Sequence, residues 1–101
     1  MKARVADFLA RLEESSSPHT VRGYRQNLSV FVEWSAEQGV TNPSEITHRH
    51  LRGFLVALGD RDISRATIGR YLAAVRSFTR YLTREGDGFG ILIGSIANGV
   101  T

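Results

Sequence analysis

Residues 64–86 read SRATIGRYLAAVRSFTRYLTREG, and this stretch decides the fold. Its apolar side chains recur every three or four residues, which is the spacing of one face of an α-helix. The members of this stripe are Ile68, Leu72, Val75, Phe78 and Leu82. Ser64 suits the N-cap before the first turn, and Gly86 suits the position after the last turn. The pattern predicts a helix over about 65–85, with Tyr71 at the edge of its apolar stripe.

The same spacing occurs in three earlier stretches of the chain, at about 2–14, 18–38 and 45–58. The residues that cap or end these stretches are Ser17 with Pro18, Gly39, Ser44 or Thr47, and Gly59. We expect the buried interior to contain Phe8, Leu28, Phe31, Phe54, Leu55, Leu72, Val75 and Phe78. The chain is therefore predicted to be all-α, with four helices that form two helical hairpins packed across each other.

Length and composition fit one globular domain. The chain has 101 residues, of which 42% are hydrophobic and 23% charged, and these shares are ordinary for a soluble protein. It has no cysteine, which excludes a disulfide scaffold and agrees with a reducing cytoplasm. No apolar stretch reaches the roughly 20 residues of a membrane span, and the charged N-terminus does not resemble a signal peptide. We therefore expect a cytoplasmic protein that does not bind membranes.

Residues 87–101, DGFGILIGSIANGVT, differ from the rest of the chain. They contain four of the ten glycines and a single charge, Asp87, and their aliphatic residues lack a helical spacing. The segment is a short strand, an apolar tail that docks on the domain, a disordered extension, or a stretch unrelated to the domain. We divide the chain into a domain of residues 1–86 and a short irregular C-terminal tail of unknown role. Deleting the tail is expected to leave the melting temperature nearly unchanged unless the tail completes the core.

The most informative feature is where the arginines lie. Twelve of the thirteen basic residues are arginine, and the formal net charge is +3. Between Ile63 and Arg84 there are five arginines and no acid, and between Ser15 and Val32 there are two arginines and His19, again without an acid. Exposed helix faces usually mix both signs, because opposite charges four residues apart stabilise a helix. Acid-free helices therefore favour a polyanionic partner, although a merely solvated arginine-rich face is the alternative.

A helical wheel places these arginines in rows beside the apolar stripes. The row of the last helix contains Arg65, Arg76, Arg80 and Arg84, with Arg70 at its far edge. Gly69 and Ala73 lie on the same face, where small side chains let a partner approach closely. The row of the second helix contains Arg22, Arg25, Gln26 and Ser29. Arginine, glutamine and serine are side chains that contact DNA phosphates and base edges.

No set of residues supports catalysis or metal binding. His48 and His50 lie two positions apart, so they point to different sides of a helix and make a poor chelate; we expect a solvated helix N-terminus there. No pair of carboxylates suits acid–base chemistry. Tyr24, Tyr71 and Tyr81 are expected to pack at the core or its edge rather than to act as nucleophiles. We expect no cofactor, no metal and no catalytic residue.

The second to fourth helices together resemble a known family. SPHTVRGYRQNLSVFVEW at residues 17–34, followed by a loop, a helix and the stretch 64–86, is similar to the N-terminal core-binding, SAM-like domain of tyrosine recombinases and phage-type integrases of the Xer kind. The resemblance covers about residues 2–86. Its markers in the second helix are Ser17, Thr20, Tyr24, Leu28, Phe31 and Trp34. Those in the last helix are Ser64, Thr67, Leu72, Ala74, Arg76, Phe78, Tyr81 and Leu82.

The resemblance implies half of a clamp around double-stranded DNA, with the second and fourth helices facing the major groove. The implied DNA-binding residues are Thr20, Arg22, Arg25, Gln26, Arg65, Arg70, Arg76, Arg80 and Arg84. In this family a catalytic domain follows, and we expect it to be absent here, so that the chain is not an enzyme by itself. His19 and Arg22 match the catalytic H-x-x-R motif only by coincidence, because they lie in the wrong domain. Other recombinase protomers are the second implied partner. The alternative is a helical protein–protein interaction module whose arginine-rich face meets an acidic protein.

Overall fold

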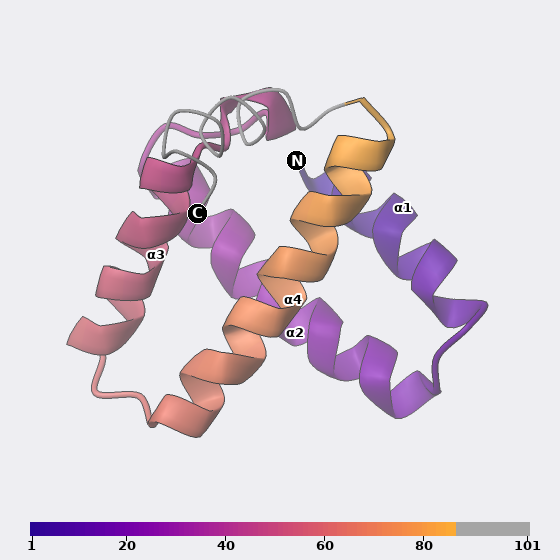
Figure 1. Cartoon of the computed structure of the whole chain (residues 1–101), viewed down its shortest axis with the longest axis horizontal. Coiled ribbons are helices and arrows are strands. Elements are labelled where there is room, and N and C mark those ends of the chain that lie inside the picture. The colour runs from indigo at the N-terminus through magenta and orange to yellow at the C-terminus, as the bar shows by residue number, and fades with distance from the viewer. Residues whose placement is uncertain (87–101) are drawn as a thin grey trace.

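The computed structural model describes residues 1–86, which form four α-helices and no strand (Figure 1). The elements are α1 (Lys2–Glu13), α2 (Pro18–Glu37), the short 3₁₀ helix η1 (Pro43–Glu45), α3 (His48–Asp60) and α4 (Arg65–Arg84). The predicted all-α fold and its four helices are confirmed. Residues 87–101 lie outside the described part of the chain, so the expectations about the tail stay predictions.

Side-chain caps and glycines determine where the helices begin and end. The Ser17 and Ser64 hydroxyls accept hydrogen bonds from backbone N–H groups three residues later, both at 3.2 Å, as expected of N-caps. Gly39 and Gly86 follow α2 and α4 with positive φ angles of 80° and 82°, a conformation that glycine adopts without steric cost. These predicted boundaries are confirmed.

The boundaries of α3 differ from the prediction at one end. Its N-cap is Thr47, whose hydroxyl accepts from the His50 N–H at 3.1 Å, and this was one of the two expected starts. The predicted end at Gly59 is wrong, because α3 continues through Asp60. A glycine weakens a helix without ending it, and here the chain leaves the helix at Asp62, which has a φ of 56°.

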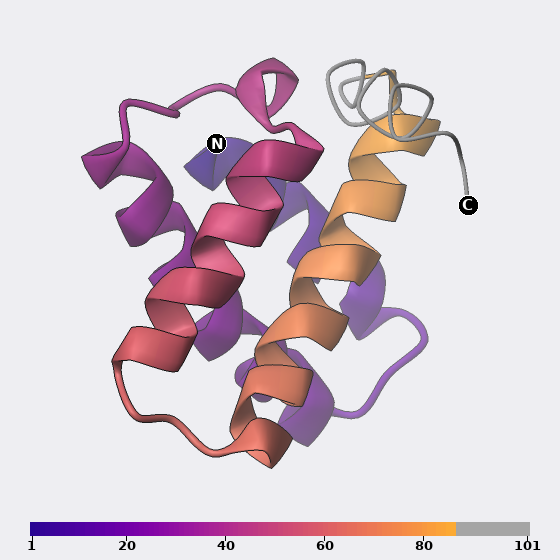
Figure 2. The ribbon, with the colours of Figure 1, turned by 60° about the vertical axis from the view of Figure 1, so that its left-hand side comes forward.

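The two hairpins, α1–α2 and α3–α4, cross each other as predicted. In Figure 1, α4 lies in front of α2 and crosses it near the middle, with α3 on one side and α1 on the other. Figure 2 shows α3 and α4 side by side with α2 behind them. The contact between α2 and α4 is the largest between any two helices, and α4 also contacts α1 and α3. One side of α4 is therefore fixed by all three other helices.

The core contains most of the residues that the spacing predicted. Of the eight, six are buried, and Leu55 and Leu72 are only half-buried, which corrects the prediction. Both line a hollow of about 390 Å³ between α3 and α4, so these helices do not close over them. Ile46, in the loop before α3, is fully buried, although no helical spacing pointed to it.

The expectation of a solvated N-terminus on α3 is wrong for His50. Its Nε2 and the buried Ser35 hydroxyl share a hydrogen bond of 2.8 Å. Its ring centroid lies 4.6 Å from that of Trp34 and 5.6 Å from that of Phe31. Burial lowers the pKa of the His50 imidazole below its ordinary value of 6.5, because the charged form loses hydration.

This histidine predicts a loss of stability in mild acid. The unfolded chain takes up the proton at about pH 6.5 and the folded chain only at lower pH. The contribution of neutral His50 to the free energy of unfolding is therefore complete above about pH 6.5, the ordinary pKa. It is lost as the pH falls from there toward the lower pKa of the folded chain. We expect the free energy of unfolding, measured with urea, to be lower at about pH 5.5 than at about pH 7.5. The His50→Gln variant should lose most of this difference. The matched variant of the exposed His19, His19→Gln, should keep it, and a full pH dependence in His50→Gln would contradict the assignment.

Within residues 1–86, no helix has the length and hydropathy that crossing a bilayer requires.

Candidate nucleic-acid interface

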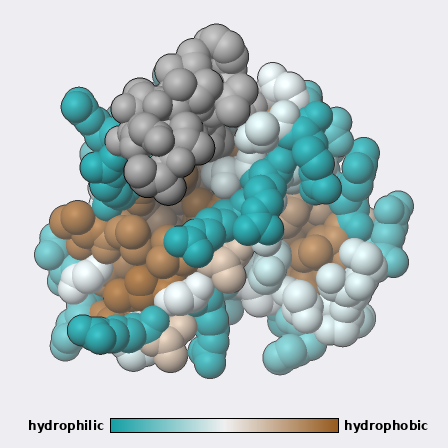
Figure 3. Space-filling model, in the orientation of Figure 1, coloured by the Kyte–Doolittle hydropathy of each residue, from teal (hydrophilic) through white to brown (hydrophobic). Residues whose placement is uncertain are grey.

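The five arginines of α4 are all exposed. They lie on the side of the helix that its three neighbours leave uncovered, because the apolar stripe occupies the other side. In Figure 3 a hydrophilic band follows the upper part of α4, with a hydrophobic area on the side toward α3. The sequence thus produces a helix with one buried and one strongly cationic side.

None of these five guanidinium groups forms an ion pair with an acid of residues 1–86. The described ion pairs join Arg4 to Asp7 at 3.4 Å, Arg11 to Glu85 at 3.1 Å and Arg25 to Glu13 at 3.8 Å. Only Arg25 among them belongs to the predicted site, and the side chains of Arg25 and Glu13 are each about 60% exposed, where such pairs contribute little. The positive charge of α4 therefore has no compensation within the described part of the domain.

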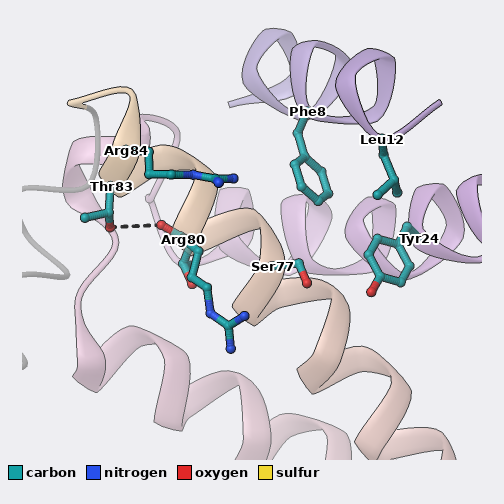
Figure 4. Close-up of a pocket in the computed structure, with 8 residues that line it drawn as sticks. Phe8, Leu12, Tyr24, Ser77, Arg80, Thr83 and Arg84 are labelled. Atoms are coloured by element: carbon teal, nitrogen blue, oxygen red, sulfur yellow. Dashed lines mark hydrogen bonds between the residues drawn. The ribbon is translucent and has the colours of Figure 1, made fainter. Parts of the chain in front are cut away.

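Three arginines of α4 lie one turn apart along the helix and line the hollows on its two sides: Arg76, Arg80 and Arg84. The hollow between α3 and α4 has an apolar floor that includes Phe54 and a rim that includes Arg76 and Arg80. Arg80 also lines a second hollow, of about 580 Å³, together with Arg84 where α4 meets α1 and α2 (Figure 4). A ligand that runs along α4 would meet all three guanidinium groups in sequence.

The predicted row on α2 is divided between two neighbouring surfaces. Arg22 and Arg25 line a hollow of about 390 Å³ at the turn between α1 and α2, together with Glu13. Gln26 lines a separate hollow of about 520 Å³ with Arg70, between the N-terminal parts of α2 and α4. The structure brings Gln26 and Arg70 together, whereas no residue of α4 lines the hollow of Arg22 and Arg25.

The remaining predicted residues lie at the beginnings of these helices. Thr20 is exposed, and its hydroxyl lies 3.1 Å from that of the N-cap Ser17. Arg65 is exposed at the first position of α4. Asn27, which the prediction omitted, donates from its Nδ2 to the Arg70 carbonyl at 3.4 Å. This bond ties α2 to α4 beside the hollow that Gln26 and Arg70 share.

Sequence reasoning also missed two hydroxyl groups close to the arginines of α4. Tyr24 was expected to pack at the core or its edge, and it is half-buried, but it also lines the hollow of Arg80 and Arg84. Ser77 lines the same hollow from α4. The signal for Ser77 was present, since the helical wheel that groups the arginines places it between Arg84 and Arg70. Nothing in the spacing of Tyr24 separates it from a core residue.

Comparisons with known proteins agree with this architecture. The family model for the phage integrase N-terminal SAM-like domain matches residues 5–86. The tyrosine recombinase XerC of Oceanobacillus iheyensis is 34% identical over 76 residues, which cover 75% of this chain and 25% of that protein. XerC of Pelotomaculum thermopropionicum is 37% identical over 92 residues, which cover 84% of this chain and 30% of that protein. The chain therefore spans between a quarter and a third of the length of these curated relatives.

No solved structure shows a significant match. The match to the family model includes all of α2, α3 and α4 and most of α1. The chain belongs to the family of phage integrase N-terminal SAM-like domains.

Proposed function

We propose that this chain is the DNA-binding N-terminal domain of a site-specific tyrosine recombinase and that it clamps duplex DNA through α2 and α4. The observation that carries the proposal is the row of exposed arginines on α4 without an acidic partner among residues 1–86. A duplex presents closely spaced phosphates, and each arginine that neutralises one releases a bound counterion, which drives association. The relatives named as tyrosine recombinases match over a quarter to a third of their length, as expected for one domain of a larger enzyme.

The proposed contacts differ along the two helices. Arg76 and Arg80 reach phosphates or guanine edges, while Arg84 contacts the backbone alone. Gln26 and Arg70 act together, because they line one hollow. Arg22 and Arg25 form the second row on α2, and Thr20 and Arg65 extend the contact surface at the beginnings of the helices.

The proposal includes other recombinase protomers as partners in the full-length assembly, and a cytoplasmic location. The proposed DNA-binding domain comprises residues 1–86, and residues 87–101 are a tail of unknown role.

A salt titration of binding to a random duplex tests this function. The affinity is expected to fall steeply with salt, with a log–log slope of about −0.9 for each phosphate that the domain neutralises. A protein-interaction module with an arginine-rich face would show no such binding. Absence of duplex binding at low salt would therefore reject the proposal and favour the alternative.

The domain alone is expected to leave DNA uncleaved. The resemblance assigns catalysis to a separate domain that supplies a tyrosine nucleophile with arginines and histidines around the reacting phosphate. Here the hollow of Tyr24 contains two arginines without a histidine, and the hollow of Tyr71 contains one arginine and His19. We expect no covalent adduct with a nicked duplex on a denaturing gel. An adduct that disappears in Tyr24→Phe or Tyr71→Phe would show catalysis by this domain.

A further inference from the structure

The hollow between α1, α2 and α4 combines apolar and cationic walls (Figure 4). Phe8 and Leu12 of α1 form its apolar side, and Arg80 and Arg84 line it from α4. In Figure 4, Arg84 extends from α4 toward the helix that carries Phe8 and Leu12. The hollow therefore fits a ligand that has a carbon-rich part and a negative charge.

Two hydroxyl groups in this hollow are free to bind a ligand. The Thr79 and Thr83 hydroxyls also lie there, but they donate to the Arg76 and Thr79 carbonyls at 3.0 and 2.9 Å. The Tyr24 and Ser77 hydroxyls, in contrast, form no hydrogen bond with any residue of 1–86. Together with the two guanidinium groups, they supply hydrogen-bond donors on the surface where the charge is uncompensated.

The ring of Tyr24 is held in place before any ligand binds. It stacks on the Phe8 ring with centroids 6.3 Å apart and an angle of 15° between the planes, and Phe8 is itself buried against Phe78 at 5.8 Å. A side chain that is fixed in advance loses little entropy on binding. The position of the hydroxyl is thus set by the core.

We propose that this hollow binds one sugar–phosphate unit of the DNA backbone, with Tyr24 and Ser77 as contact residues beside Arg80 and Arg84. The deoxyribose packs on the apolar wall of α1, and the phosphate oxygens accept hydrogen bonds from the hydroxyl and guanidinium groups. Charge-assisted hydrogen bonds of this kind are stronger than neutral ones. The inference rests on the proposed DNA-binding function and adds α1 and two uncharged residues to the interface.

Removal of single hydroxyl groups tests the inference. Tyr24→Phe and Ser77→Ala keep the ring and the helix, and each should weaken duplex binding at fixed low salt by about 12- to 150-fold, as expected for a lost hydrogen bond to a charged group. The salt slope should stay unchanged in both, because no charge is removed. Arg84→Ala, in contrast, should reduce the magnitude of the slope by about 0.9. Tyr81→Phe, which alters a buried tyrosine, and Ser44→Ala, which alters an exposed serine of η1, are the matched controls.

The outcomes separate this inference from the proposed function. If the unaltered chain binds duplex with a steep salt dependence while Tyr24→Phe and Ser77→Ala bind equally well, the inference is overturned and the proposed function stands. An equal loss in Tyr81→Phe, or a shift of the melting temperature in Tyr24→Phe, would show a general effect on folding and also overturn it. If the unaltered chain binds no duplex, the proposed function fails and the inference falls with it.

Discussion

Replacing Arg80 by alanine is expected to weaken binding to duplex DNA by about 1–3 kcal/mol for a bidentate contact, and to reduce the magnitude of the salt slope by about one for a phosphate contact. Arg80 is exposed in the C-terminal half of α4 and lines the hollows on both sides of that helix. It has no acidic partner among residues 1–86, so its removal breaks no ion pair of the described domain. Fluorescence anisotropy with a labelled duplex at two salt concentrations measures both quantities.

Arg76→Ala should behave similarly. The side chain of Arg76 is exposed and forms no hydrogen bond with another helix of residues 1–86. It therefore has no interhelical contact of this kind that its replacement would break. We therefore expect its replacement to lower DNA affinity and to leave the melting temperature unchanged.

Arginines of α1 provide the controls for both variants. Arg4 and Arg11 lie on a helix that also carries acids, and Arg11 pairs with Glu85 at 3.1 Å and lies 5.8 Å from the centroid of the Tyr81 ring. Arg11→Ala should thus affect stability more than DNA binding, and Arg4→Ala should affect binding little. If either costs as much affinity as Arg80→Ala, the DNA-binding face is assigned wrongly. If none of the four matters at low salt, the protein-interaction alternative gains support.

Replacing Phe31 by alanine should have the largest effect on stability, about 3–5 kcal/mol. Phe31 is fully buried in α2, and its ring lies 5.0 Å from that of Phe54 and 5.6 Å from that of His50. The cavity left by the ring would lie where α2 meets α3. Since small domains are stable by only about 5–15 kcal/mol, this variant would be close to unfolding. Urea denaturation followed by circular dichroism measures the loss.

Val56→Ala is the matched control for Phe31→Ala. Val56 is a hydrophobic residue of α3 that is 65% exposed, so its replacement should change stability by less than about 0.5 kcal/mol. If Phe31→Ala does not fold at all, Phe31→Leu provides a smaller loss that can be measured. Equal effects of Phe31→Ala and Val56→Ala would show that Phe31 is not part of the core.

The helices could be predicted from the sequence because their signals are local. The serine caps and the glycines after α2 and α4 act within one turn, and the apolar spacing of α4 specifies which side of it is buried. Burial of Leu55 and Leu72 could not be predicted correctly, because it depends on how closely α3 approaches α4. Burial of Ile46 likewise depends on the path of a loop, which leaves no periodic pattern.

The same limit applies to the candidate site. A helical wheel orders residues around one helix but does not say which neighbour stands beside each flank. Arg25 and Gln26 are the two ends of the predicted row on α2, about 100° apart on its wheel, and they line different hollows, one beside α1 and one beside α4. The location of Tyr24 is a tertiary property for the same reason, since its hollow needs three helices.

The two sides of α4 are expected to tolerate substitution to different degrees. Its buried side contacts every other helix, so most changes there are expected to lower the free energy of unfolding. Its exposed side carries side chains that the described domain does not need for folding. Substitutions on the exposed side can therefore alter affinity or sequence preference while the free energy of unfolding stays within about 0.5 kcal/mol. We expect mainly folded members in a library that is randomised on the exposed side of α4, at Arg65, Gly69, Ala73, Arg76 and Arg80. New target preferences could therefore be selected on this helix while the rest of the domain stays unchanged.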